Sequence, residues 1–459
     1  MVFEKYRDQM IKNIQEVVKI RSVIDTPVEN GPFGKGNKQS LEFVLNLCKD
    51  LGFEVCNLDG YCGYAQVGKG EEIFAIITHL DVVPEGEGWD YEPYEAKIVD
   101  GYLYGRGVWD DKGPAIISIY ALKALMDSNF QFKKRIRLIF GCNEESGSLC
   151  VEHYLKKEGQ ISYGFTPDAD FPVIFAEKDI NHFKIKGKAI NENNVKLLKF
   201  NAGVADNAVP GKATFILEDS ENLEINIQKI TNYLKENKID YSYKINQNQV
   251  KIEVIGKSAH GSVPFEGINA ASYALVALSK TNIKNYFVEM YAKYINTEYN
   301  GKSLNCFAHD QYGDIAVNVG IVNYENNYFE IVINSRLPFN YNTKKQIDSI
   351  KETLKNYPVE VILESESKGF HIPENSLLIQ NLLRAYQEES NDYESKPICI
   401  AGGTYAREFK NCVGFGPSLP SSPVENMHGA NERLKLSLLE PIFMIYYKAI
   451  AYLHDNITF

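Results

Sequence analysis

The chain has 459 residues, a formal net charge of -11, and 44% apolar and 24% charged residues. This length suits two domains, or one domain with a large insertion, and the composition is that of a globular protein rather than of a long disordered segment. The acidic balance argues against a nucleic-acid or anionic membrane surface, because both require concentrated lysine and arginine.

The N-terminal segment MVFEKYRDQMIKNIQEVVKI is charged throughout, and its apolar residues (Tyr6, Met10 and Ile14 among them) recur on one helical face. This pattern predicts an amphipathic helix and not a secretory signal. The sequence contains no run of 18 apolar residues, so we expect no transmembrane helix. The eight cysteines form no C-x-x-C pair, which indicates free thiols in a reducing cytoplasm.

The first 180 residues alternate between strand-like and helix-like segments. Residues 73–78 and 135–140 are continuous apolar strands, and residues 113–126 have helical length, with a glycine and a proline at their start. The alternation predicts an α/β fold with a mixed, mostly parallel sheet and helices on both faces. In such sheets reactive groups gather beyond the carboxyl ends of the strands.

From about residue 181 the pattern changes. HFKIKGKAI, ATFILE, VKIEVIG and YFEIVINSRLP alternate apolar and polar residues, as half-buried antiparallel strands do. Helical stretches near 222–236 and 269–281 separate them, and α/β character returns after about 375. The sequence therefore predicts an α/β domain of residues 1–180 and 375–459, interrupted by an inserted α+β domain of residues 181–374.

The first candidate cluster follows the strand at 73–78. In THLDVVP, His79 and Asp81 come directly after that strand. A metal-bound imidazole needs an acceptor for its other ring nitrogen, and a carboxylate two residues on can supply one. A polar strand end is the alternative interpretation.

Paired carboxylates occur twice further along the chain. Asp110 and Asp111 in YGRGVWDDKGP lie in a glycine-rich turn before a helix, and a carboxylate there can bridge two cations about 3.5–4 Å apart. Glu144 and Glu145 in GCNEESGS follow the strand at 135–140, and such neighbours resist joint ionisation unless a cation pairs with one of them. Acidic residues that start a helix, or a solvated acidic turn, are the ordinary alternatives.

Asp168 in TPDADFP and His428 in ENMHGANER complete the set. With His79, Asp110 and Glu145 they provide two imidazoles and three carboxylates. Shared between two ions, with Asp110 counted twice, they supply three protein ligands to each ion, which is the count of an open catalytic site. We therefore expect two divalent metal ions, zinc first, with manganese or cobalt as alternatives.

The order of these motifs resembles the M20 metallopeptidase family. The motifs THLDVVP, GRGVWDDKGP, NEESGS, TPDADFP and a late MHGANE occur in the order found in that family, and the resemblance covers essentially the whole chain. TPDADFP, AGGTYAR and the large insertion are most similar to the PepV-type bacterial dipeptidases. The resemblance implies a cytoplasmic, metal-dependent dipeptidase that acts on small dipeptides, with the insertion as a lid domain. It also implies a monomer, because the lid of similar monomeric enzymes closes the cleft without a partner subunit.

The resemblance implies a role for each proposed ligand. His79 and Asp168 would bind one metal, Glu145 and His428 would bind the other, and Asp110 would bridge them.

Other positions match residues that act on the substrate in similar enzymes. Asp81 would orient the first histidine, and Glu144 would be the general base. In the insertion, His260 of SAHGSVP would reach the scissile carbonyl. Asn207 of NAVP and Arg336 of NSRLP would contact the substrate, with Arg336 as a clamp for its carboxylate.

The segment AGGTYAR at 401–407 resembles a glycine-rich substrate-binding loop, in which Gly403 and Thr404 would contact the substrate. Two residues depart from the family pattern. Trp109 precedes the bridging aspartate where relatives often have a small residue, and Gly261 follows the lid histidine.

Two other functions compete with the dipeptidase interpretation. An N-acyl-amino-acid deacylase or aminoacylase could use the same metal site, and the sequence does not reveal the acyl pocket. A non-catalytic binding protein would usually lack a ligand or the base, whereas all are present here. Glu432 either supports His428 or is a surface helix charge. The remaining histidines match no motif and are interpreted as structural: His153, His182, His309, His371 and His454.

Overall fold

The computed structural model describes residues 2–339, 341–423 and 425–457. The chain divides into two compact units. Unit 1 comprises Met1–Glu177 and Phe370–Phe459, and unit 2 comprises Lys178–Gly369. The division thus falls at 177/178 and 369/370, where the sequence led us to expect 180/181 and 374/375.

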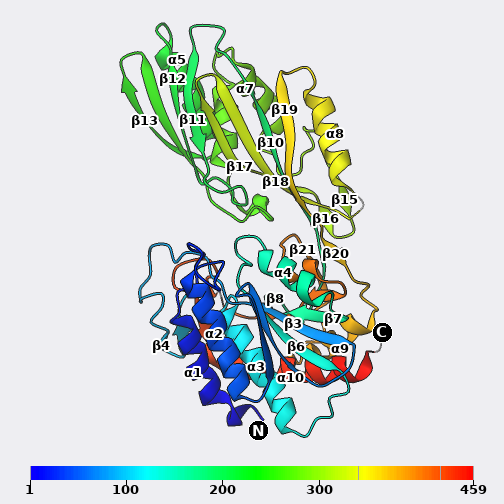
Figure 1. The fold of residues 1–459 in the computed structure, drawn as a ribbon. Helices are drawn as coiled ribbons and strands as arrows, with labels where there is room; N and C mark the ends of the chain where they lie inside the picture. Colours follow the sequence, from blue (N-terminus) through cyan, green and yellow to red (C-terminus); the bar gives the residue numbers. More distant parts are fainter. Residues whose placement is uncertain (1, 340, 424, 458–459) are drawn as a thin grey trace. The chain divides into compact units, whose positions relative to one another are not determined.

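Unit 1 takes its helices and strands from both sides of the insertion (Figure 1). Before the insertion they are η1 (Phe3–Lys5), α1 (Arg7–Val18), α2 (Lys35–Asp50), β1 (Glu54–Leu58), β2 (Cys62–Val67), β3 (Ile73–His79), β4 (Lys97–Val99), β5 (Tyr102–Tyr104), α3 (Lys112–Asp127), β6 (Arg135–Gly141), α4 (Leu149–Glu158), β7 (Tyr163–Thr166), β8 (Ala169–Asp170) and β9 (Ile174–Glu177). After it they are β20 (Phe370–His371), α9 (Leu377–Ser390), β21 (Ile398–Ile400), η4 (Tyr405–Glu408), β22 (Cys412–Gly414), β23 (Pro417–Ser418), β24 (Arg433–Lys435), η5 (Leu436–Leu438) and α10 (Leu439–Asn456).

The main sheet of unit 1 has the strand order β1-β2-β6-β3-β7-β22-β9-β20, with β21 also paired to β9. Its central strands β6, β3, β7 and β22 run parallel, and antiparallel pairs lie toward both edges. All of β3 is buried, as its continuous apolar sequence requires of a central parallel strand. The predicted α/β fold with a mixed sheet is confirmed.

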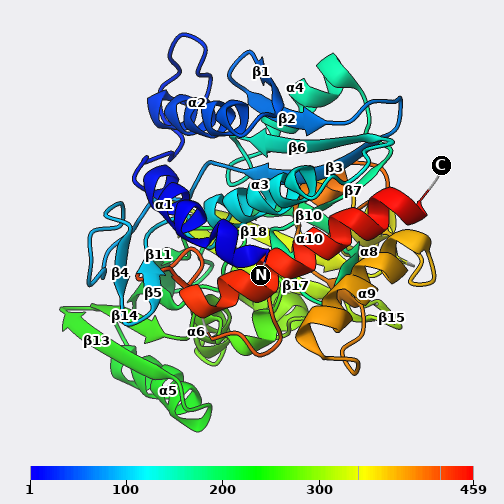
Figure 2. The ribbon, with the colours of Figure 1, turned by 90° about the horizontal axis from the view of Figure 1, so that it is seen from below.

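Helices α3, α10 and α1 form a packed layer in unit 1, seen from below in Figure 2. Helix α3 is apolar nearly all round and is buried along most of its length. Helix α10 is long and apolar enough to suit a membrane span, which the sequence did not lead us to expect. Its contacts with α3 and α9, and its buried residues such as Phe443 and Tyr446, make it a core helix of this unit.

Unit 2 contains an eight-stranded sheet and several helices. In chain order its elements are β10 (Asp179–Lys188), β11 (Lys196–Ala202), β12 (Lys212–Glu218), α5 (Leu223–Glu236), β13 (Asp240–Asn246), β14 (Gln249–Ile255), η2 (Pro264–Glu266), α6 (Ala270–Leu278), α7 (Tyr286–Met290), η3 (Tyr291–Ile295), β15 (His309–Asp310), β16 (Gly313–Asp314), β17 (Ala316–Glu325), β18 (Tyr328–Leu337), α8 (Thr343–Leu354) and β19 (Val359–Ser367).

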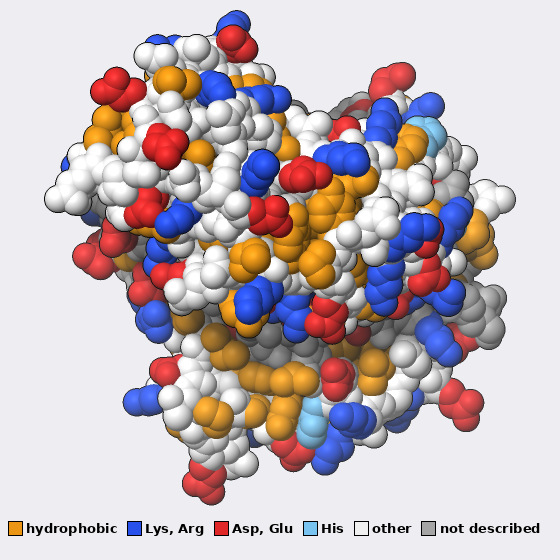
Figure 3. Space-filling model, turned by 90° about the horizontal axis from the view of Figure 1, so that it is seen from above, with side chains coloured by type: hydrophobic (Ala, Val, Ile, Leu, Met, Phe, Trp, Pro, Cys, Tyr) orange, Lys and Arg blue, Asp and Glu red, His pale blue; other side chains and the backbone are white. Residues whose placement is uncertain are grey.

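The sheet of unit 2 has the order β13-β14-β12-β11-β17-β18-β10-β19, and its neighbouring strands pair antiparallel. Strand β14 alternates buried and more exposed residues, which the period of VKIEVIG predicts. Its buried residues share one core with residues of α5, α6 and α8. Charged pairs such as Lys199–Glu325 and Lys212–Glu253 link neighbouring strands. On the face drawn in Figure 3, side chains of both charge signs are interspersed.

Two chain segments connect the units, at residues 177–178 and 369–370. The two segments contact each other both within unit 1 and within unit 2. In unit 1, Phe370 of β20 is the ladder partner of Glu177 of β9. In unit 2, the Asp179 carboxylate accepts hydrogen bonds from the Gly369 backbone N–H (2.8 Å) and the Lys368 ammonium (2.8 Å). The chain therefore enters and leaves unit 2 at adjacent points.

Candidate metal centre

The carboxyl ends of three neighbouring strands bring the predicted residues of unit 1 together. His79 is the last residue of β3 and is aligned with Gly141 at the end of the parallel strand β6. Glu144 and Glu145 follow β6, and Asp168 follows β7 on the other side of β3. The side chains therefore gather at one edge of the sheet, as expected in an α/β fold.

Asp110 lies between the two histidines. Its Oδ1 is 2.9 Å from His79 Nε2, and its Oδ2 is 2.9 Å from His428 Nε2. His428 Nε2 is also 3.2 Å from Glu145 Oε2, and His79 Nε2 is 3.7 Å from Asp168 Oδ2. Each oxygen of Asp110 thus faces a different histidine, and a further carboxylate lies beside each histidine Nε2.

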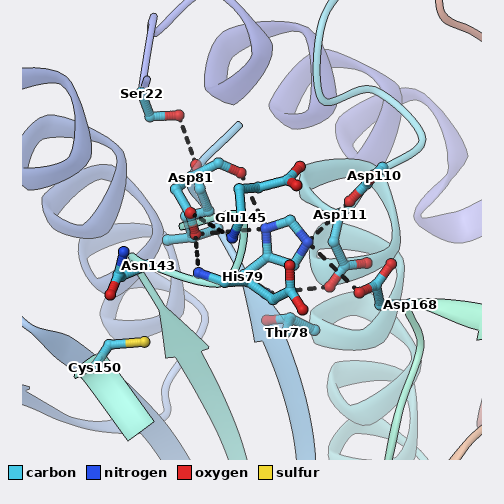
Figure 4. A network of polar contacts seen from close by, with 12 residues as sticks. Ser22, Thr78, His79, Asp81, Asp110, Asp111, Asn143, Glu145, Cys150 and Asp168 are labelled. Atoms are coloured by element: carbon cyan, nitrogen blue, oxygen red, sulfur yellow. Dashed lines mark hydrogen bonds and ion pairs between the residues drawn. The ribbon is translucent and has the colours of Figure 1, made fainter. Parts of the chain in front are cut away.

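Among the described residues, two groups of three side chains have ligand atoms within 4.8 Å of one another: His79 with Glu144 and Asp168, and His79 with Asp110 and Glu145. Figure 4 shows Asp110, Glu145 and Asp168 around the His79 imidazole. Nitrogen and carboxylate ligands in this number can hold zinc, manganese or cobalt.

The His79 ring is oriented by its neighbour on the same loop. Its Nδ1 is 3.0 Å from the Asp81 main-chain carbonyl oxygen, and the nearest Asp81 carboxylate oxygen is 3.6 Å away. Because a carbonyl can only accept, Nδ1 carries a hydrogen, and Nε2 is the ring atom left to bind a metal. This buried Nε2 faces carboxylate oxygens of Asp110 and Asp168. An imidazole nitrogen among carboxylates is a donor set that suits a divalent metal ion, so the residues present fit one.

The Asp81 carboxylate has a different partner from the one that the sequence suggested. Its two oxygens accept hydrogen bonds from the backbone N–H groups of Glu144 (3.0 Å) and Glu145 (3.1 Å). Asp81 therefore connects His79, through its carbonyl, to the loop that carries both glutamates.

The neighbouring acidic groups favour the protonated form of both histidines. Hydrogen bonds to Asp110 and Glu145 raise the pKa of His428 to about 11. Burial opposes a charge on His79, but contacts with Asp110 and Asp81 outweigh it and raise its pKa well above the usual value. A metal ion must displace these protons, because only a neutral imidazole can be its ligand.

The carboxylates of the cluster have divergent pKa values. Burial and the charge of Asp110 raise the pKa of Asp168 to about 7, and burial raises the pKa of Glu144 well above its usual value. Burial also opposes ionisation of Asp110, but hydrogen bonds from the two histidines hold its pKa below the usual range. The pattern is that of several acidic groups competing for positive charge in one buried site.

The predicted lid residues lie in unit 2, where two of them share one set of backbone contacts. The Gly261 N–H donates to the Asn207 carbonyl (2.6 Å), and Ala208 forms a β-bridge with His260. A Cβ on Gly261 would lie 2.8 Å from that carbonyl oxygen and 2.9 Å from its carbon. Gly261, which departs from the family pattern, thus allows the loop of His260 to approach the Asn207 backbone.

A polar group supports the Asn207 segment. The Asn318 amide donates to the carbonyls of Asp206 (2.8 Å) and Ala208 (3.1 Å), on either side of Asn207. The Asp206 carboxylate is 2.6 Å from His182 Nδ1, so His182, which matched no motif, has a structural partner here. Arg336 is buried on β18 and aligned with Ile180.

The loop of Gly403 and Thr404 is anchored at the end of β9. The Thr404 hydroxyl donates to Glu177 Oε1 (2.7 Å), and Arg407 Nε donates to Glu177 Oε2 (2.9 Å). Arg407 also donates to the Gly402 carbonyl (3.0 Å). The Thr404 hydroxyl is thus used within the protein.

The sequence did not reveal how Glu432 and Arg106 are used. Glu432 is fully buried and is not a surface helix charge. Its carboxylate accepts from Arg106 and from backbone N–H groups of the segment before Asp110. Among the remaining histidines, His454 is buried and accepts from the Lys133 backbone N–H (2.9 Å). In the sequence, the available signals for the Arg106–Glu432 contact were the arginine of GRG and the glutamate of NER.

Comparison with known proteins supplies a family and a fold. Residues 75–452 match the family described as Peptidase family M20/M25/M40. A Staphylococcus aureus protein (strain bovine RF122 / ET3-1), provisionally named a dipeptidase, is 33% identical over 458 residues, covering 97% of this chain and 97% of that protein.

Solved structures of peptidases have the same fold. Human carnosine dipeptidase 1 aligns with a TM-score of 0.58 at 14% identity, covering 99% of this chain and 98% of that one. A tripeptidase from Staphylococcus aureus aligns with a TM-score of 0.57 at 14% identity, covering 98% and 99%. At these identities the alignments show the shared fold and leave the length of the substrate open.

Proposed function

Because the chain belongs to peptidase family M20/M25/M40, we propose that it is a metal-dependent dipeptidase of the cytoplasm, acting as a monomer. Its curated relatives at 33% identity bear a dipeptidase name, which supports the substrate class. All eight cysteines are free, which suits a reducing compartment.

The position of the buried His79 Nε2 among carboxylates is the observation that carries the metal proposal. This atom is 2.9 Å from Asp110 Oδ1 and 3.7 Å from Asp168 Oδ2, and the side chains of Glu144 and Glu145 also group with His79. We assign His79 and Asp168 to one ion, Glu145 and His428 to a second, and Asp110 to both. Two divalent cations, zinc first and manganese or cobalt next, would lower the pKa of water and polarise the scissile carbonyl.

We assign the proton transfers to Glu144. It would take a proton from the attacking water and return one to the leaving amine, and burial, which raises its pKa, makes its carboxylate a stronger base. The Asp81 carboxylate accepts a hydrogen bond from the Glu144 backbone N–H, and the Asp81 main-chain carbonyl accepts one from the His79 ring. In unit 2, His260 would donate to the developing oxyanion, Asn207 and Arg336 would bind the substrate, and Arg336 would pair with its carboxylate.

The proposal is tested with Ala-Ala, β-Ala-His, Ala-Ala-Ala and N-acetyl-Ala, each assayed with metal-free enzyme and after addition of zinc or manganese. We expect hydrolysis of the two dipeptides only, restored by metal. Cleavage of N-acetyl-Ala alone would place the protein among the deacylases, and cleavage of Ala-Ala-Ala would place it among peptidases of wider specificity. Activity that metal removal leaves unchanged would contradict the metal mechanism.

Substitution of Gly261 tests the lid assignment. Gly261→Ala would force the His260 loop away from the Asn207 backbone, because the new Cβ has no room. We expect kcat/KM for Ala-Ala to fall by up to about 10²-fold, the loss that a displacement of about 1 Å can cause, and stability to fall by about 1–3 kcal/mol through overpacking. Glu266→Ala, on the exposed part of the same loop, is the control. Equal kcat/KM in both variants would remove His260 and Asn207 from the mechanism.

A further inference from the structure

Two loops that carry proposed ligands of the same ion are joined at their bases. Strand β5 leads into the segment that ends at Asp110, and strand β24 follows the segment that contains His428. The strands pair through Tyr104 and Arg433, and the Gly105 N–H donates to the Glu432 carbonyl (3.0 Å). Glu432 thus lies where the two loops meet.

The Glu432 side chain is fully buried and is surrounded by donors from the Asp110 loop. Its Oε1 accepts from the backbone N–H groups of Trp109 (2.9 Å) and Asp110 (3.2 Å). Its Oε2 accepts from the Gly107 N–H (2.9 Å) and from Arg106 Nη1 (2.7 Å). Both oxygens therefore fix the backbone that ends in the proposed bridging ligand.

Arg106 extends these contacts to the other ligand. Its guanidinium is also buried, and Nη2 donates to the carbonyls of Gly429 (3.0 Å) and Glu85 (3.3 Å). Gly429 directly follows His428. The backbone of His428 has a φ of 58°, in the left-handed region that residues other than glycine seldom occupy. Such a backbone persists when its surroundings hold it, and Arg106 is one of the groups that do so here.

We infer that the buried Arg106–Glu432 pair is a positioning device that holds Asp110 and His428 at the separation needed to bind one metal ion. Neither side chain is a ligand. The inference rests on the proposed function, because it assumes that Asp110 and His428 bind metal. Partners that fix ligands in this way typically change metal affinity by about 10–100-fold when they are lost.

The chemistry of the contacts requires a carboxylate at position 432. All four partners of Glu432 are donors, so a protonated carboxyl group or an amide would place a hydrogen against another donor. Glutamine has the same shape, and it would therefore disturb the hydrogen bonds rather than the packing.

The test measures zinc affinity of the full-length protein by competition with a chelator, for wild type and Glu432→Gln. We expect affinity at the weaker site to fall about 10–100-fold. Excess zinc should restore kcat for Ala-Ala with KM near the wild-type value. The control is Glu158→Gln, which removes the carboxylate partner (2.9 Å) of buried Arg137 in the same unit. This variant should lose stability while it keeps the wild-type zinc affinity.

A second variant keeps the test decisive if Glu432→Gln does not fold. Arg106→Lys retains the charge, but one ammonium cannot make the forked contacts to Glu432 and the Gly429 carbonyl. We expect zinc affinity at least about tenfold below wild type. Wild-type affinity in a folded variant at either position would overturn the inference and leave the two-metal proposal intact. Failure of the wild-type protein to bind zinc or manganese would overturn both.

Discussion

Glu144→Gln is expected to lower kcat for Ala-Ala by about 10²–10⁴-fold, the range associated with loss of a general acid–base group. Glutamine has nearly the same shape, but it cannot accept the proton of the attacking water. KM should change little, because Glu144 is not assigned to substrate binding. Stopped assays of dipeptide hydrolysis across a range of substrate concentrations measure both parameters.

Metal content decides between two roles for Glu144. Its carboxylate lies within 4.8 Å of the ligand atoms of His79 and Asp168, so its position alone would also suit a ligand. A general base can be replaced with the metal content unchanged, whereas loss of a ligand should reduce it. Elemental analysis of Glu144→Gln should therefore match wild type, and a reduced content would reassign Glu144 as a ligand. Glu152→Gln, on the exposed surface of α4, controls for the loss of one acidic side chain.

Asp110→Asn should abolish activity to the level of metal-stripped enzyme, a larger loss than that of Glu144→Gln. Asparagine has one oxygen where the proposed bridge needs two, and the two oxygens of Asp110 face different histidines at 2.9 Å. We expect both metals to be lost or greatly weakened together. Metal content after dialysis, measured beside dipeptide hydrolysis, tests this expectation.

Asp111→Asn is the matched control for the bridging residue. Asp111 is also buried and accepts a hydrogen bond from the His79 backbone N–H (3.2 Å), which an asparagine oxygen can also do. Burial and the charge of Asp168 raise the pKa of Asp111 well above its usual value, and asparagine keeps the shape of the side chain. This variant should keep its metal. Equal metal loss in both variants, or retention of both ions by Asp110→Asn, would exclude Asp110 as the bridge.

The sequence predicted the elements that carry the candidate metal site because their local signals agree. Residues 73–78 are a continuous apolar run, and a parallel central strand is buried on both faces. A glycine and a proline mark the start of the helix after Asp111. Since reactive groups gather at the carboxyl ends of such strands, His79 and Glu145, which follow the two predicted strands, could be grouped before their positions were known.

The supporting contacts could not be predicted, because they depend on tertiary packing. A glutamate four residues after a histidine has the spacing of a helix surface, yet Glu432 is buried against backbone N–H groups more than 300 residues away in sequence. The sequence likewise could not show that His79 uses the carbonyl of Asp81 while the Asp81 carboxylate holds the glutamates. The close approach of Gly261 to Asn207 depends on two loops that are distant in the chain.

The paired connections at the boundary have an evolutionary consequence. Because Glu177 and Phe370 are ladder partners, a short turn in place of residues 178–369 would convert β9 and β20 into an ordinary hairpin. An ancestral gene could therefore have gained unit 2 within a hairpin without rerouting the surrounding strands. The entropy of closing a loop grows only with the logarithm of its length, so later lengthening of the insert would have met little resistance. Unit 2 could likewise be exchanged as a module while the strand ends that carry the proposed ligands stay unchanged.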